Sequence, residues 1–225
     1  MSIGTWLLTA FIGLSIIYAY IFVRNAPGLT NDQRHAYRTL LSWVAVPMGI
    51  SVAVYTGVLL GAMPARPFWN SPVLALLFLV SSVSTGVAVI LLARALLAGK
   101  TDRQYHESGY LLAVSDVMLI GFELMAILLF IMYAHLTIGG VKEAMSVILF
   151  GGVLAAQFWI GVVGVGLFFP ALVELYYVIP RLLYQKAFAA PRGIEIAVPI
   201  AVLIGGFMLR YVVVIAGQIT GPVGI

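Results

Sequence analysis

The sequence contains no cysteine, few histidines and few charged side chains. None of its 225 residues is cysteine, three are histidine, and 9% are charged. The absence of cysteine excludes a disulfide framework, and it also excludes an iron–sulfur cluster or a thiolate-bound metal held by this chain. With 63% hydrophobic residues and a mean hydropathy of +1.11, the chain has more apolar surface than a soluble core can use. The composition therefore predicts an integral membrane protein.

The three histidines do not favour a b-type haem site. His35, His106 and His135 fall in predicted connections or at a predicted helix end. A haem held by two histidines needs them to face each other within a helical bundle. We therefore expect no haem in this chain, so any redox cofactor must come from elsewhere.

Six apolar stretches are long enough to cross a hydrocarbon layer, which takes about 20 helical residues. The first stretch does not look like a cleaved signal peptide, because no basic residue precedes it and no small-residue cleavage pattern follows it. The fifth stays apolar beyond Pro170, which predicts a kinked or unusually long helix. We expect an all-α, polytopic membrane bundle, with residues 1–225 forming one domain. The six stretches are residues 5–23, 40–62, 72–98, 110–134, 145–169 and 194–219.

The lysines and arginines are concentrated on alternate connections between these stretches. Nine fall on one side, whereas only Arg66 and Lys142 fall on the other, and Arg210 lies inside the last stretch. Short cytoplasmic connections are enriched in basic residues, so both termini are expected on the non-cytoplasmic side. The net charge of +4 then needs no nucleic-acid partner to explain it. The nine are Arg24, Arg34, Arg38, Arg94, Lys100, Arg103, Arg181, Lys186 and Arg192.

Small residues recur at intervals that favour close helix packing. The pairs Gly57 with Gly61 and Gly161 with Gly164 are typical of helix contacts in membranes. We expect both pairs to lie where helices approach one another.

Three ionisable residues are expected within the bilayer. Asp116 and Glu123 are seven residues apart, so two helical turns return them to nearly the same face of the fourth helix. They could pass a proton between them, since buried ionisable groups commonly mark proton paths. Alternatively, Arg210 could pair with one of these carboxylates and lock two helices together. The sequence leaves relay and lock open.

The outer part of the second helix and the connection after it hold further candidates. Tyr55 could donate a hydrogen bond to a quinone carbonyl, or it could be a tyrosine of the interfacial aromatic belt. The connection at residues 62–72 reads AMPARPFWNSP, with three prolines, Arg66 and a tryptophan that looks exposed. Such a rigid segment is suited to contact a partner, although a belt tryptophan and a turn would explain it equally.

Three stretches together resemble the NrfD/polysulfide reductase membrane-subunit family. The longest, residues 55–88, reads YTGVLLGAMPARPFWNSPVLALLFLVSSVSTGVA. The second is SDVMLIGFE with Asp116 and Glu123, and the third is FMLRYVVVIAGQ with Arg210. The resemblance covers nearly the whole chain.

The resemblance implies a membrane anchor in a prokaryotic inner membrane that exchanges electrons between the quinone pool, menaquinone or ubiquinone, and a four-cluster iron–sulfur subunit. That subunit would in turn serve a molybdopterin or multihaem catalytic subunit. Tyr55 matches the family tyrosine that contacts the quinone near the outer face. Arg66, Trp69 and Asn70 fall where the partner subunit would sit.

The chain departs from the family in its number of spans. Relatives generally have eight or more, and the opening MSIGTWLL resembles the start of their third helix, so we expect that two helices are missing. Two other hypotheses remain alongside the anchor. One is a proton- or ion-conducting transporter bundle without a redox role, and the other is a purely structural anchor.

Overall fold

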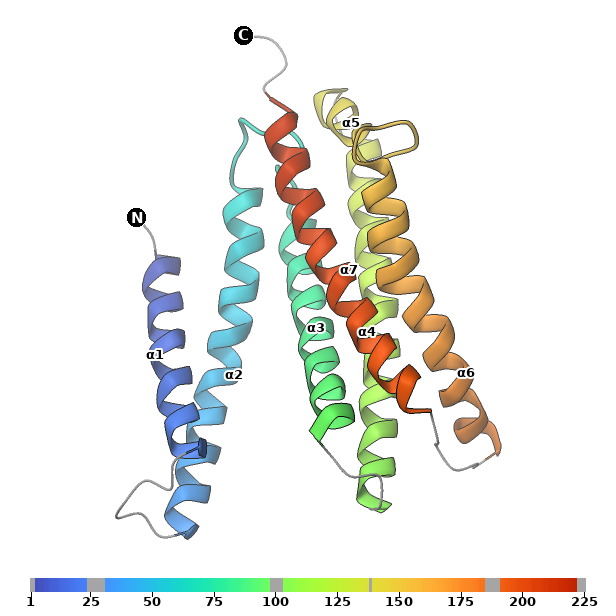
Figure 1. Ribbon diagram of the computed structural model, residues 1–225. Coiled ribbons are helices and arrows are strands. Elements are labelled where there is room, and N and C mark those ends of the chain that lie inside the picture. Colours follow the sequence, from blue (N-terminus) through green and yellow to red (C-terminus); the bar gives the residue numbers. More distant parts are fainter. Residues whose placement is uncertain (1–2, 24–30, 98–102, 138, 185–190, 222–225) are drawn as a thin grey trace.

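The computed structural model is a bundle of long helices (Figure 1). It describes residues 3–23, 31–97, 103–137, 139–184 and 191–221. Within these ranges every long element is helical and no strand occurs. The elements are α1 (Ile3–Val23), α2 (Asn31–Gly61), α3 (Val73–Leu97), α4 (Arg103–Leu136), α5 (Gly139–Met145), the π-helix η1 (Gln157–Phe168), α6 (Phe169–Tyr184) and α7 (Arg192–Ile219).

Six helical segments are long and apolar enough to cross a membrane, which confirms the predicted multi-pass membrane protein. The first four and the last agree with the predicted stretches to within a few residues. The six segments are Ile3–Phe22, His35–Gly61, Val73–Leu97, Gly109–Leu136, Gln157–Leu183 and Arg192–Ile219.

The predicted position of the fifth span was wrong. Residues 145–169 were expected to form it, but the segment crosses at Gln157–Leu183 instead. The chain leaves α5 at Met145 and then makes several turns, one of them through Gly151, whose φ of 93° favours glycine. η1 then runs directly into α6. The helix therefore continues through Pro170, as predicted, but it is not unusually long, because α2 and α4 are both longer.

The helices run up and down, so that α1 begins and α7 ends at the same end of the bundle (Figure 1). The α2–α3 connection and α5 also lie at this end, which we call the outer end. The opposite, inner end holds the end of α1, the start of α2 and the start of α4. α1 packs on α2, and α2 packs on α3. α3 also contacts α4 and α7, and α7 packs closely along η1.

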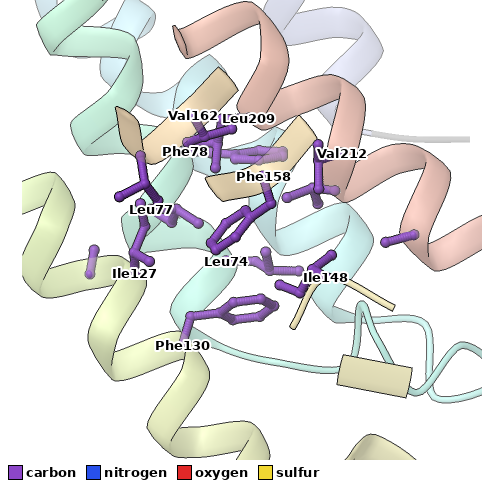
Figure 2. Close-up of a cluster of buried hydrophobic side chains, with 14 of the residues drawn as sticks. Leu74, Leu77, Phe78, Ile127, Phe130, Ile148, Phe158, Val162, Leu209 and Val212 are labelled. Carbon is purple, nitrogen blue, oxygen red and sulfur yellow. The ribbon is translucent and has the colours of Figure 1, made fainter. Parts of the chain in front are cut away.

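Figure 2 shows the buried cluster where the four later spans meet. Phe68 and Phe130 pack edge to face, with ring centroids 5.6 Å apart. Lipid tails are as apolar as these side chains, so close packing rather than exclusion of water holds the cluster together. The labelled side chains are Leu74, Leu77, Phe78, Ile127, Phe130, Ile148, Phe158, Val162, Leu209 and Val212.

Glycines allow the helix backbones to approach closely at two points. A Cβ at Gly57 would overlap the backbone of Ala75 on α3, and a Cβ at Gly205 would overlap that of Gly166 on η1. Gly61 and Gly161 also have close neighbours on other segments. The predicted role of the glycine pairs as helix contacts is therefore confirmed at Gly57 and Gly161, whereas Gly61 lies against the α2–α3 connection.

Candidate functional site

The guanidinium of Arg210 on α7 forms the centre of a buried polar network. Its Nη1 donates hydrogen bonds to the carbonyl oxygen of Gly206 at 2.7 Å and to Ser81 Oγ at 3.3 Å. Its Nη2 donates to Ser82 Oγ at 3.0 Å. Because both serines belong to α3, the guanidinium cross-links α3 and α7. A cation inside a bilayer needs such partners.

Glu123 on α4 joins this network through Ser81. Its side chain is buried, lies beside Ser81 and is in the field of the Arg210 charge. Ser81 therefore bridges the guanidinium and the carboxyl group. The arrangement brings together two of the residues that the sequence singled out, and it links α3, α4 and α7. Whether the link serves as relay or lock stays a hypothesis.

Asp116 also lies on α4, closer to the inner end of the bundle than Glu123. The side chain is fully buried, and its Oδ1 accepts a hydrogen bond of 3.3 Å from Ser84 Oγ on α3. A second carboxyl group, that of Glu174 on α6, lies beside it. Three buried carboxyl groups thus lie along one polar route through the bundle.

Tyr55 lies near the outer end of α2, with its ring against α1. A Cβ at Gly4 would overlap this ring, so the close approach requires glycine at position 4. The ring is half-buried, and no hydrogen bond to its hydroxyl is found among the described residues.

An open groove of about 490 Å³ lies between α1, α2 and α3. Residues from the ranges 11–18, 42–53 and 79–83 line it, and most of them are apolar. The hydroxyls of Ser15 and Ser42 donate to the backbone carbonyls of Phe11 and Thr39, each at 2.8 Å. Ser82 differs, because its hydroxyl also receives the hydrogen bond from Arg210. Ser82 therefore connects the groove to the buried network.

The α2–α3 connection is fastened to the outer end of α7. Arg66 Nη1 donates to the carbonyl oxygen of Gln218 at 2.9 Å and to that of Gly217 at 3.4 Å. These are among the last carbonyls of the helix, which lack intrahelical partners and favour a nearby cation. Arg66 thus caps α7 from outside the helix.

Trp69 is buried rather than exposed, so that expectation was wrong. Only 9% of the residue is exposed, because its indole ring packs beside Gly217 on α7. Asn70, in contrast, is exposed, and its carbonyl oxygen accepts a hydrogen bond of 3.1 Å from the Tyr133 hydroxyl. The proposed docking role of Arg66, Trp69 and Asn70 stays a prediction.

The histidines and carboxylates do not form a metal centre in the part of the chain that the structure describes. No group of three histidine, cysteine, aspartate or glutamate side chains could hold a metal ion there. His35 lies near the start of α2 and His135 near the end of α4, at opposite ends of the bundle (Figure 1). The His106 side chain lies outside the described set.

Comparison with known proteins identifies the family. The family model "Polysulphide reductase, NrfD" matches residues 1–222. This chain belongs to the NrfD family. It is 35% identical over 186 residues to the C subunit of polysulfide reductase from Wolinella succinogenes, a match that covers 79% of this chain and 53% of that protein. It is 30% identical over 198 residues to protein NrfD of Escherichia coli, covering 88% and 58% respectively. No solved structure matches significantly.

This NrfD-family chain spans about half the length of the curated relatives that it matches. A third relative, an NrfD homologue of Haemophilus influenzae, is 36% identical over 184 residues, which is 80% of this chain and 54% of that protein. The family assignment confirms the resemblance found in the three sequence stretches. It assigns no role to an individual residue.

Glu174 is the member of the polar route that sequence reasoning missed in this NrfD-family chain. The predicted fifth span ended at residue 169 and so left Glu174 outside the bilayer, whereas the observed span Gln157–Leu183 contains it. A signal was present, because the sequence remains apolar from Pro170 to Tyr177 around this one carboxyl group. The Gly151–Gly152 pair, a common turn signal, marks the turn before the span.

Proposed function

We propose that this chain is a membrane subunit of an oxidoreductase complex that exchanges electrons between the quinone pool and an iron–sulfur partner subunit. The observation that carries the proposal is the apolar groove between α1, α2 and α3; Tyr55, half-buried against Gly4 of α1, lies on α2 outward of the residues that line it. The family assignment supports it, because the curated relatives include subunits of a polysulfide reductase and of a selenate reductase.

The groove fits the tail of a quinone, although Tyr55 itself does not line it. Ligand sites are commonly apolar cavities of about 300–1,000 Å³ with a few polar groups, and the groove lies within that range. Its opening between α1, α2 and α3 suits a ligand that moves within the lipid. The Tyr55 hydroxyl would donate a hydrogen bond to a quinone carbonyl, and the groove would hold the isoprenoid tail. A bound quinol supplies two electrons and two protons on oxidation. The same residues suit menaquinone and ubiquinone.

Electrons would leave through the outer end of the bundle. The α2–α3 connection carries Arg66 and Asn70 at that end, and the buried Trp69 holds the connection in one conformation against α7. A partner with four iron–sulfur clusters, itself joined to a molybdopterin or multihaem catalytic subunit, would dock there. Such a rigid surface loses little conformational entropy on binding.

The buried polar route would carry protons between the groove and the inner end. Ser82 lines the groove and contacts Arg210, and Ser81 connects Arg210 to Glu123. Glu123 and Asp116 are two helical turns apart on one face of α4. Arg210 would hold Ser81 and Ser82 in place, while the carboxyl groups would accept and release protons.

The charge distribution supports a prokaryotic inner membrane with the outer end facing away from the cytoplasm. Nine basic residues belong to the connections of the inner end or to the helix ends beside them, against two at the outer end. In this orientation the iron–sulfur partner would be non-cytoplasmic.

The test replaces Tyr55 by phenylalanine in the intact complex. Tyr55→Phe removes the hydroxyl and keeps the ring on Gly4, so quinol-linked turnover should fall while the complex still assembles. Tyr37→Phe is the matched control, because Tyr37 lies on the same helix at its inner end and is 48% exposed. Equal turnover of the wild-type chain and Tyr55→Phe with a menaquinol analogue would refute the quinone site.

A second candidate is a proton- or ion-conducting bundle without redox function, which the three buried carboxyl groups favour. It requires no partner subunit. A single, monodisperse chain that moves protons across vesicle membranes without quinone would support this function. Iron that co-purifies with the chain in a mild detergent would support the redox subunit.

A further inference from the structure

Two carboxyl groups from different helices meet in the inner half of the bundle. Asp116 comes from α4 and Glu174 from α6, and the two side chains lie close enough to interact directly. The two residues are 0% and 6% exposed, so water does not cover the contact. Ser84 on α3, also fully buried, donates to Asp116 Oδ1 at 3.3 Å. Three helices therefore surround the pair.

The hydrogen bonds around the pair are incomplete without a further proton. Asp116 Oδ2 and Glu174 Oε2 are both buried and have no hydrogen-bond donor among the described residues. Ionised carboxylates only accept hydrogen bonds, so two of them in contact have no hydrogen to share. Two adjacent buried negative charges would also repel each other strongly in a medium of low dielectric constant. One proton placed between the two carboxyl groups removes both difficulties.

The charged groups nearby do not replace this proton. Glu123, on the same helix, adds a further acidic group that interacts with Asp116. The positive charge of Arg210 acts on Glu123, and its described hydrogen bonds go to serines and a backbone carbonyl. Arg181 on α6, two turns beyond Glu174, lies over the ring of Tyr110 at 4.2 Å. No described lysine or arginine donates a hydrogen bond to the pair.

A metal ion fits the same oxygens poorly. Hard metal cations take about six or more oxygen ligands, whereas this site offers two carboxyl groups and one hydroxyl. A proton needs only the two oxygens that lack a donor.

We propose that Asp116 and Glu174 share a single proton, and that Ser84 positions the Asp116 carboxyl group for this sharing. The pair carries one net negative charge and one short, charge-assisted O–H···O bond, which is stronger than a neutral hydrogen bond. If the proposed function holds, the pair is part of the proton route. It then accepts a proton from the direction of Glu123 and releases it toward the inner end. The shared proton itself belongs to the resting protein.

The experiment is infrared difference spectroscopy of the purified complex in its resting state, in H₂O and in D₂O. A protonated carboxyl group has a C=O stretching band that shifts in D₂O, whereas carboxylates lack it. We expect a band that is lost or shifted in both Asp116→Asn and Glu174→Gln. Glu143→Gln, which changes an exposed glutamate on α5, should leave the band unchanged. Glu123→Gln should also retain it.

Three results would overturn the proposal. The first is a spectrum without such a band. The second is a band that responds to only one of the two substitutions, because the proton would then belong to a single residue. The third is a band that disappears when Na⁺ replaces K⁺, which would indicate a metal ion at the site.

If the amide variants do not fold, Asp116→Glu and Glu174→Asp retain two carboxyl groups, and each must then shift the band. The infrared experiment measures the resting protein and not its turnover. Its outcome therefore does not depend on whether Tyr55 binds quinone.

Discussion

The indole Nε1 of Trp69 donates a hydrogen bond of 2.8 Å to the carbonyl oxygen of Val213. This bond joins the α2–α3 connection to a helix more than 140 residues later in the sequence. Together with Arg66 on the last carbonyls of α7, it fixes the conformation of the outer surface at which a partner would dock. The fold of the last helix and the shape of this surface therefore depend on each other.

Trp69→Phe should destabilise the protein, because it removes a buried hydrogen bond and part of the contact with Gly217. The loss of one such bond costs about 1 kcal/mol, and the smaller ring adds to the cost. The measurement is the temperature at which the purified protein loses its monodisperse gel-filtration peak. Trp43→Phe is the control, since Trp43 on α2 is 76% exposed and should tolerate the change. Equal losses in the two variants would contradict the proposed role of Trp69.

Gly4→Ala should impair quinol oxidation without loss of the protein. The new methyl group would overlap the Tyr55 ring and displace its hydroxyl. A displacement of about 1 Å at a reacting group can cost up to roughly 100-fold in rate, so we expect at least a tenfold fall in quinol-linked turnover. Gly13→Ala on the same helix meets no atom within 4 Å and should keep full turnover. Similar turnover in both variants would argue against the Tyr55 site.

Glu123→Gln separates the relay from the lock. The glutamine keeps the size of the side chain and can still bond to Ser81, so a relay function predicts lower proton transfer with nearly unchanged stability. A lock predicts the reverse, since the interaction with the Arg210 charge would be lost. The account predicts a several-fold fall in quinol-linked proton release, measured with a pH-sensitive dye, and a change in stability within about 0.5 kcal/mol. Glu143→Gln is the control for the loss of an acidic group.

Gly205→Ala should weaken the packing of α7 against η1. Its Cβ would overlap the backbone of Gly166, so one of the two helices has to move. Overpacking of this kind typically costs about 1–3 kcal/mol. Gly121→Ala on α4 is the matched control, because a Cβ at Gly121 meets nothing within 4 Å. In the gel-filtration assay, Gly205→Ala should therefore lose its monodisperse peak at a lower temperature than the wild-type protein, and Gly121→Ala should not.

Hydropathy alone predicted five of the six spans well, because each is an apolar run bounded by charged or turn residues. The fifth failed because the apolar run is longer than one span. Residues 146–156 are nearly as apolar as the helix that follows, yet they turn at the outer end through Gly151. Composition cannot distinguish an apolar turn at the membrane surface from the first half of a crossing helix.

The site was predictable to the extent that it depends on helical periodicity. Asp116 and Glu123 share a face of α4 because they are seven residues apart, and the structure places both at buried positions. The contacts of Asp116 with Glu174 and of Trp69 with Val213 join distant segments. Such pairings depend on how the helices pack, which periodicity within one helix does not determine.

The most direct test of the proposed function is the reduction of a co-purified partner by quinol. The complex would be isolated in a mild detergent, and its iron–sulfur clusters would be followed by electron paramagnetic resonance after addition of a menaquinol or ubiquinol analogue. The account predicts that an iron–sulfur subunit elutes with the membrane subunit, that quinol reduces its clusters, and that Tyr55→Phe slows this reduction. A membrane subunit that elutes alone and without iron, or clusters that quinol does not reduce, would contradict it.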